Sequence, residues 1–211
     1  MPVTLHAPGY STYGRTARLA LEEKGVAYTL EEVDILAGQG QAPEHLVRHP
    51  WGKVPALDHD GFALFETFAI ARYVDEAFPG PALQPGDVRT RARMTQICAI
   101  VDSYAYRAMV HQVFWQAVLV PMQGGTPDAK VAAEGLAAAE RSLDVIEGLM
   151  AGDLLCGGQL TLADLQLLPP VEFFRMADAG REAFARRPLL SAWWERMNER
   201  PSVVKTRPKL G

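Results

Sequence analysis

Short apolar runs separated by turn residues dominate the first third of the chain. Val3 to Leu5 has the pattern of a buried strand, and residues 16–24 are good helix formers that end at Gly25. Residues 27–34 alternate weakly between apolar and polar positions, which predicts a second strand. A strand, a helix and a strand in this order predict a βαβ unit.

A hairpin and another helix follow this unit. Ala56-Leu57 and residues 62–65 flank turn residues at 58–61, and a helix is expected over residues 68–78. Val54-Pro55 leads into the hairpin. Because proline has no backbone N–H, it cannot lie in a central strand, and the bond before it is a candidate for the cis form. The whole order, βαβ followed by ββα, predicts a thioredoxin-like α/β domain.

Helical spacing of apolar residues continues through the remainder of the chain. One long helix is expected over residues 89–120, and a second over residues 128–150. Either Thr126 or Asp128 can cap the second helix, since both residue types accept hydrogen bonds from free backbone N–H groups.

Thr161 and Asp164 have the spacing of a capping box at the start of a later helix. A Pro-Gly-Pro run marks the break between the α/β pattern and the helical pattern. The predicted division is therefore a thioredoxin-like domain over residues 1–78, a linker over residues 79–88 and an all-helical domain over residues 89–211.

Composition and charge argue against several classes of function. The chain has 211 residues, of which 48% are hydrophobic, so it can bury a substantial core. Its net charge of −4 argues against nucleic-acid binding, and no apolar run reaches the roughly 20 residues that span a bilayer. The first residues show no signal-peptide pattern, and Cys98 and Cys156 lack the spacing of a metal or redox motif. We therefore expect a cytoplasmic protein with no nucleic-acid or membrane partner.

The loop after the first strand, residues 8–15, is the expected place of the chemistry. It delivers residues to the start of a helix, where a thiolate is favoured. The loop contains no cysteine, which disfavours disulfide exchange, but it carries four hydroxyl groups, on Tyr10, Ser11, Thr12 and Tyr13. A hydroxyl at this position can donate a hydrogen bond to a thiolate that the ligand supplies.

Four motifs in this order resemble the cytosolic glutathione transferases. They are Ser11-x-x-x-Arg15, Val54-Pro55, Glu66-Thr67, and the Thr161–Asp164 box with Trp193-Trp194 downstream. The first motif is similar to the serine-type classes phi, theta and zeta and to many bacterial relatives. The resemblance implies a detoxification enzyme that conjugates the glutathione thiolate to small hydrophobic electrophiles, with Ser11 as the catalytic serine.

The resemblance also implies a set of glutathione contacts. Val54 would bind the cysteinyl part through its main chain, and Pro55 would fix that geometry. Glu66 and Thr67 would hold the amino and carboxylate groups of the γ-glutamyl part. Thr67 stands where relatives commonly have serine, a change that keeps the hydroxyl.

At the glycyl end the chain departs from the family pattern. Lys53 is the expected partner of the glycyl carboxylate. The loop at residues 38–41 lacks the basic residue often found there, so Gln41 would substitute weakly. His49-Pro50 stands where Asn-Pro is common.

The remaining expectations concern the second substrate and the assembly. Tyr10, His111 and Trp115 are candidates for the electrophile pocket. The family also implies a homodimer, in which Asp102 would reach the γ-glutamyl amine bound by the partner subunit. Glutathione is the co-substrate, and neither a cofactor nor a metal is expected.

The sequence leaves several alternatives open. His45 and His49 are four residues apart and could share a helix face as metal ligands, but no third ligand is evident. The same thiolate could serve a glutathione-dependent isomerase, peroxidase or dehalogenase. A non-catalytic interaction module would be favoured by a degraded Ser11 or Glu66-Thr67, and both motifs are intact.

Overall fold

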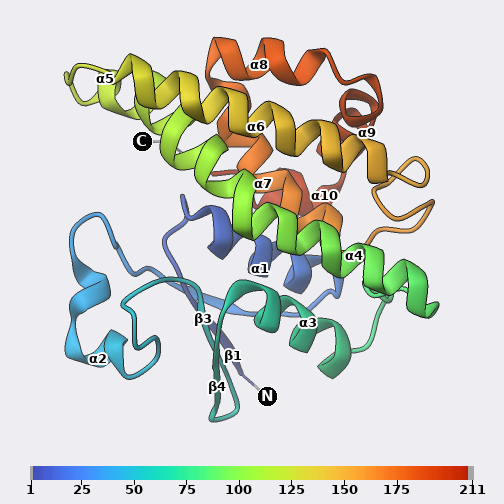
Figure 1. Cartoon of the computed structure of the whole chain (residues 1–211). Coiled ribbons are helices and arrows are strands. Elements are labelled where there is room, and N and C mark those ends of the chain that lie inside the picture. Colours follow the sequence, from blue (N-terminus) through green and yellow to red (C-terminus); the bar gives the residue numbers. More distant parts are fainter. Residues whose placement is uncertain (1, 209–211) are drawn as a thin grey trace. The chain divides into compact units, whose positions relative to one another are not determined.

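A four-stranded mixed sheet forms the centre of the first of two units (Figure 1). The computed structural model describes residues 2–208. Unit 1 runs to Gln84 and includes the segment that begins at Arg200, and unit 2 is Pro85–Glu199. The strands lie in the order β2-β1-β3-β4, with β1 at Val3–His6, β2 at Thr29–Glu31, β3 at Ala56–His59 and β4 at Phe62–Phe65.

The pairing of these strands explains the buried apolar runs. β1 pairs in parallel with β2 and antiparallel with β3, so that Leu5 lies opposite both Leu30 and Leu57. Leu5 and Leu57 are fully buried. The β3–β4 hairpin turns at Asp60 and Gly61, which both have positive φ, as a two-residue hairpin turn requires. The predicted hairpin is confirmed, with a tighter turn than expected.

Helices α1 (Thr12–Glu23) and α3 (Thr67–Ala77) pack against each other and against the sheet. α1 begins earlier than residues 16–24 because Ser11 caps it. Gly25, at a φ of +66°, ends it as predicted. The thioredoxin-like order is therefore confirmed. β2 is shorter than residues 27–34, since it is an edge strand paired only with β1.

Two short helices between β2 and β3 were not predicted. They are η1 (Gln39–Gln41) and α2 (Pro43–Leu46). Each is too short to show an apolar period, and tertiary contacts hold them. His45 Nε2 lies 2.7 Å from the carbonyl oxygen of Lys53.

The end of the described chain packs on α1 rather than belonging to the helical unit. Arg15 is fully buried and donates to the carbonyl oxygen of Val203 at 3.2 Å and to Thr206 Oγ1 at 3.3 Å. These bonds anchor α10 (Pro201–Lys205), which the expected division had placed in the helical domain. A chain that returns to an earlier domain leaves no local pattern in the sequence.

Unit 2 is helical, as predicted. Its segments are α4 (Val88–Ile100), η2 (Val101–Ala105), η3 (Arg107–Leu119), α5 (Val120–Met122), α6 (Ala129–Leu149), α7 (Leu162–Met176), α8 (Asp178–Ala185) and α9 (Pro188–Asn198). Asp128 caps α6 by accepting from the N–H groups of Lys130 and Val131. Within residues 2–208, no helix is both long and apolar enough to cross a bilayer.

The helix expected over residues 89–120 changes its winding along its length. η2 and η3 are π-helical, with hydrogen bonds five residues apart, so one regular α-helix is the wrong description. Gly135 of α6 permits a close approach to this wide helix. A Cβ there would lie 2.4 Å from Cβ of Gln112.

The capping box at the start of α7 is present, and its Asp164 also accepts hydrogen bonds from residues outside the box. Asp164 is fully buried, and its Oδ2 accepts from the N–H of Thr161 at 2.8 Å and from Thr161 Oγ1 at 2.9 Å. Its Oδ1 accepts from the N–H of Leu155 and from Trp193 Nε1, both at 2.9 Å. One carboxylate thus joins three separate parts of unit 2.

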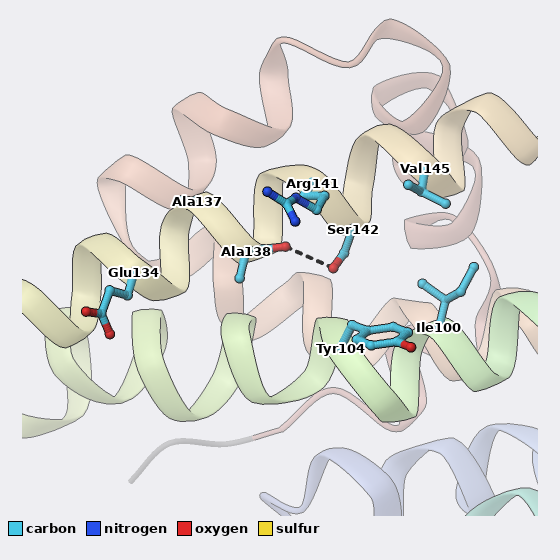
Figure 2. Close-up of a pocket in the computed structure, with 8 residues that line it drawn as sticks. All are labelled: Ile100, Tyr104, Glu134, Ala137, Ala138, Arg141, Ser142 and Val145. Atoms are coloured by element: carbon cyan, nitrogen blue, oxygen red, sulfur yellow. Dashed lines mark hydrogen bonds between the residues drawn. The ribbon is translucent and has the colours of Figure 1, made fainter.

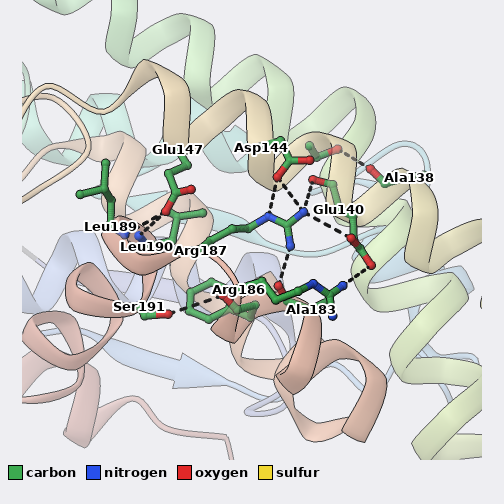
Figure 3. A network of polar contacts seen from close by, with 12 residues as sticks. Ala138, Glu140, Asp144, Glu147, Ala183, Arg186, Arg187, Leu189, Leu190 and Ser191 are labelled. Carbon is green, nitrogen blue, oxygen red and sulfur yellow. Dashed lines mark hydrogen bonds and ion pairs between the residues drawn. The ribbon is translucent and has the colours of Figure 1, made fainter.

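A second polar network joins α6 to the segment of α8 and α9 (Figure 3). Arg187 donates from Nε to Asp144 at 2.8 Å and from Nη2 to the carbonyl oxygen of Glu140 at 3.1 Å. Glu147 accepts from the backbone N–H of Leu189 at 2.9 Å, which satisfies a free donor at the start of α9. These contacts stabilise the fold and lie outside the candidate site.

Candidate active site

Ser11 stands at the turn from β1 into α1, where its side chain has two separate hydrogen-bonding capacities. Its Oγ accepts from the backbone N–H of Gly14 at 3.0 Å, which makes Ser11 the N-cap of α1. A hydroxyl can accept and donate at once. Within residues 2–208, no acceptor takes the Ser11 hydroxyl proton. That proton is available to a ligand at the positive end of the helix.

Gly14 allows this arrangement because α1 passes very close to β1. A Cβ on Gly14 would lie 2.6 Å from Cβ of Ala7 and 3.2 Å from Ser11 Oγ. A larger residue would therefore displace either the helix or the serine hydroxyl.

The competing hydroxyl of Tyr10 is already committed. It donates to Asp34 Oδ1 at 2.7 Å. Burial and this bond to a carboxylate raise the pKa of Tyr10 to about 12. Tyr10 therefore stays protonated and directed at Asp34. Thr12 is buried in the first turn of α1, and Tyr13 is half-buried beside it.

Val54 precedes β3 and offers unpaired backbone groups. The Val54–Pro55 bond is cis, as expected. Within the described residues, neither the N–H nor the C=O of Val54 has a hydrogen-bond partner. An extended ligand can pair with such groups as an added strand would.

Glu66 and Thr67 form the turn from β4 into α3. Glu66 has a φ of +74°, a conformation that non-glycine residues rarely adopt and that costs on the order of 1–3 kcal/mol. Its side chain is exposed and makes no capping bond to α3. The carboxylate is thus held outward, while Thr67 and the first N–H groups of α3 can face an anionic group.

The structure places Gln41 close to Lys53, at the end of the candidate site where the glycyl carboxylate is expected. The backbones of Gly40 and Gly52 pack so closely that a Cβ at Gly40 would lie 2.3 Å from the carbonyl oxygen of Gly52. The Gln41 amide lies against Gly52, next to Lys53. The Lys53 side chain is exposed and forms no ion pair within residues 2–208.

His45 and His49 do not form a metal site with any third ligand in the described part of the chain. Both imidazoles are buried, with ring centroids 6.5 Å apart. His49 instead packs against the rings of Phe65 and Trp51.

The other predicted site residues lie in unit 2. Asp102 is exposed on η2 and accepts from Gln166 Nε2 at 2.6 Å. His111 and Trp115 lie on η3, where their rings stack with centroids 6.5 Å apart. Tyr106 meets His111 edge-on at 5.1 Å, which gives η3 an aromatic stripe.

Unit 2 also has a largely apolar groove between α4–η2 and α6 (Figure 2). Its volume is about 620 Å³. Tyr104 lies along it with 67% of its surface exposed, and Ile100, Ala138 and Val145 supply further apolar surface. Arg141 and Glu134 add charge to the groove.

Sequence reasoning missed Glu32 and Asp34, which follow β2 and hold the loop before Ser11. Glu32 accepts from the backbone N–H of Gly9 at 3.0 Å, beside the Tyr10–Asp34 bond. The signal was present, because residues that follow two paired parallel strands meet at the same sheet edge. Acidic residues after β2 were therefore candidates to reach the loop after β1.

Comparison with known proteins identifies the family. Residues 1–76 match the family model "Glutathione S-transferase, N-terminal domain", and residues 106–201 match "Glutathione S-transferase, C-terminal domain". Glutathione S-transferase 1 of Zea mays is 35% identical over 88% of this chain and 86% of its own length. Probable glutathione S-transferase GSTF1 of Oryza sativa subsp. japonica is 31% identical over 97% and 94%.

Solved structures show the same fold. A glutathione S-transferase-I bound with lactoylglutathione superposes with a TM-score of 0.86, at 30% identity over 98% of both chains. A glutathione S-transferase I from mais, in complex with an atrazine glutathione conjugate, gives a TM-score of 0.85 at 31% identity over 98% and 96%. Two matching domain models and relatives over most of the chain show that this protein belongs to the glutathione S-transferase family.

Proposed function

We propose that this glutathione transferase conjugates the glutathione thiolate to small hydrophobic electrophiles and that it is of the serine type. The observation that carries the proposal is the Ser11 hydroxyl, whose oxygen is held by Gly14 while its proton is free for a ligand. In the reaction, the thiolate sulfur forms a bond to an electrophilic carbon. A leaving group departs with the displaced electron pair, or the adduct takes a proton from water.

The energy required for thiol activation is within reach of these groups. A free thiol with a pKa near ~8.5 is only a few per cent ionised at neutral pH. Lowering that pKa by about 2 units needs ~2.7 kcal/mol of anion stabilisation. One hydrogen bond to a charged group contributes about 1.5–3 kcal/mol, and a helix N-terminus about 0.3–1 kcal/mol.

The proposed glutathione contacts use groups that the protein leaves unpaired. Val54 would bind the cysteinyl main chain, with Pro55 fixing the backbone there. Glu66 would bind the γ-glutamyl ammonium, and Thr67 would bind its carboxylate. At the far end, Lys53 and the neighbouring Gln41 would bind the glycyl carboxylate, a pairing supported by the close approach of Gly40 and Gly52.

We propose that the electrophile binds against aromatic side chains. The ring of Tyr10 and the stripe that includes His111 and Trp115 are the candidates, since both offer apolar faces with polar edges. In this proposal unit 1 binds glutathione and unit 2 contributes the electrophile pocket.

We further propose a homodimer in the cytoplasm. We place the interface with a second copy at the apolar groove of unit 2 and exposed Tyr104, because burying apolar surface favours association. Asp102 would then bind the γ-glutamyl amine held by the partner subunit. The unpaired cysteines Cys98 and Cys156 fit a reducing compartment.

Calorimetry with glutathione, followed by conjugation assays on a panel of electrophiles, tests this function. We expect binding to glutathione and turnover with chlorodinitrobenzene-type substrates. Binding without any conjugation, but with peroxide reduction, isomerisation or dehalogenation, would assign the thiolate to that other reaction. Binding without any turnover would indicate a non-catalytic module, and an absence of glutathione binding would contradict the proposal.

A further inference from the structure

The loop after β2 connects two ends of the glutathione site that are far apart in the sequence. Tyr10 lies next to Ser11 at the thiol end, and Gln41 lies next to Lys53 at the glycyl end. Residues 34–41 run between them, at the left of unit 1 near the α2 label (Figure 1). The bonds along this segment form an unbroken chain.

The first link is the carboxylate of Asp34. Its Oδ1 accepts from the Tyr10 hydroxyl at 2.7 Å and from the N–H groups of Leu36 at 3.0 Å and Ala37 at 3.1 Å. The Leu36 N–H also reaches the Tyr10 oxygen at 3.4 Å. Tyr10 is therefore bonded to the turn itself and not only to one side chain.

The second link joins Asp34 to η1. The N–H of Asp34 donates to Gln39 Oε1 at 2.7 Å, and the N–H of Gln39 donates back to the carbonyl oxygen of Asp34 at 2.9 Å. This reciprocal pair closes the loop immediately before Gly40 and Gln41.

The third link is the contact between Gly40 and Gly52. No side chain fits there, so a shift of η1 must move the backbone at Gly52 or lose the contact. Gly52 directly precedes Lys53. The position of the glycyl subsite is thus coupled to the hydroxyl of Tyr10 through packed and hydrogen-bonded groups.

We infer that Tyr10 is a positioning residue whose hydroxyl, through Asp34, sets the glycyl subsite formed by Gln41 and Lys53. The inference rests on the proposed function, because it assumes that glutathione lies along this line. It gives the hydroxyl of Tyr10 a role in binding the thiol substrate, distinct from any role of its ring beside the electrophile.

The test compares glutathione with γ-glutamylcysteine, which lacks the glycyl residue. Tyr10→Phe removes the hydroxyl and keeps the ring. We expect it to weaken glutathione binding by roughly two- to thirtyfold, the range for residues along a coupled network, and to change γ-glutamylcysteine binding by less than about twofold. Tyr28→Phe, which removes another hydroxyl bonded within unit 1, is the matched control and should affect neither ligand.

A double-mutant cycle with Asp34→Ala separates coupling from general damage. If both residues act through one link, Tyr10→Phe should add little to the effect of Asp34→Ala on glutathione affinity. Equal weakening of both ligands, or no weakening of either, would overturn the inference. If the wild-type protein binds neither ligand, the proposed function fails instead, so the two failures are distinguishable.

Discussion

Ser11 can cap a helix and contact a ligand at the same time, two roles that are usually treated as alternatives for a loop serine. Its oxygen satisfies the N–H of Gly14, and its proton is left over. Tyr10, one residue away, donates to Asp34 instead. The local bonds therefore distinguish two hydroxyl groups that sequence spacing alone could not.

Glu66 is a second single residue on which the proposed glutathione site depends, and its replacement gives a direct prediction. Glu66→Ala removes the proposed partner of the γ-glutamyl ammonium. We expect glutathione affinity to fall by about 1.5–3 kcal/mol, roughly ten- to a hundredfold, because a hydrogen bond to a charged group is lost. Calorimetry measures this change, and Glu182→Ala, an exposed glutamate of α8, is the matched control.

The strained backbone at Glu66 gives an independent check. Glycine adopts a positive φ freely, so Glu66→Gly should unfold at a higher temperature than Glu66→Ala although both lose affinity. Equal melting temperatures for the two variants would show that the backbone conformation of residue 66 does not destabilise the protein. Unchanged glutathione affinity in both would remove Glu66 from the site.

At the scale of elements, the segment around α2 depends on buried imidazoles. His6, His45 and His49 are all buried around it. Burial lowers the pKa of His6 and of His49, so both are neutral in the folded protein at neutral pH. The charged and titratable groups that face them are Arg48, Glu31, His45 and Asp58 for His6, and Glu66, His45 and Lys53 for His49.

These lowered pKa values predict that the folded protein loses stability in acid. An unfolded histidine takes up a proton below about pH 6.5, whereas the folded His6 and His49 resist protonation to lower pH. The unfolded state then binds more protons, so the free energy of unfolding falls as pH drops below about 6.5. Denaturant unfolding at about pH 7.5 and pH 5.5 measures this loss, which His49→Asn should reduce. An equal loss in His49→Asn would exclude His49 as a source.

Elements with strong local signals could be predicted from the sequence. The β3–β4 hairpin, the stop at Gly25 and the Thr161–Asp164 box each rest on a few neighbouring residues. The Val54–Pro55 bond and the Glu66-Thr67 helix start were identified in the same way.

Features that depend on tertiary contacts could not be predicted. α2 is held by His45 against Lys53, and α10 by the buried Arg15. The π-helical winding of η3 fits α6 only because residue 135 is glycine. None of these contacts produces a repeating pattern or a fixed residue spacing in the sequence.

At the scale of the whole molecule, the proposal predicts a dimer. Sedimentation at micromolar concentration should give about twice the 23.1 kDa chain mass. Tyr104→Glu places a charge beside the apolar groove of unit 2 and should shift the protein toward monomer, since burying an unpaired charge is costly. Val204→Glu, at an exposed position of α10, is the control and should stay dimeric.

Assembly also bears on Asp102. If the dimer forms, Asp102→Ala should weaken glutathione binding in the dimer. A wild-type protein that sediments as a monomer would remove both the proposed interface and the role of Asp102 across it.

Ultraviolet titration of the thiolate of bound glutathione, in the wild type and in Ser11→Ala, tests whether Ser11 activates the thiol. If the Ser11 hydroxyl stabilises the anion, Ser11→Ala should raise the pKa of the bound thiol by about 1–2 units, because about 1.5–3 kcal/mol of anion stabilisation is lost. Glutathione affinity at acidic pH, where the bound thiol is protonated, should stay nearly unchanged. Turnover at neutral pH should fall roughly ten- to hundredfold and recover in part at higher pH. A Ser11→Ala protein that titrates like the wild type, with the shift found in Tyr13→Phe instead, would contradict the assignment of Ser11.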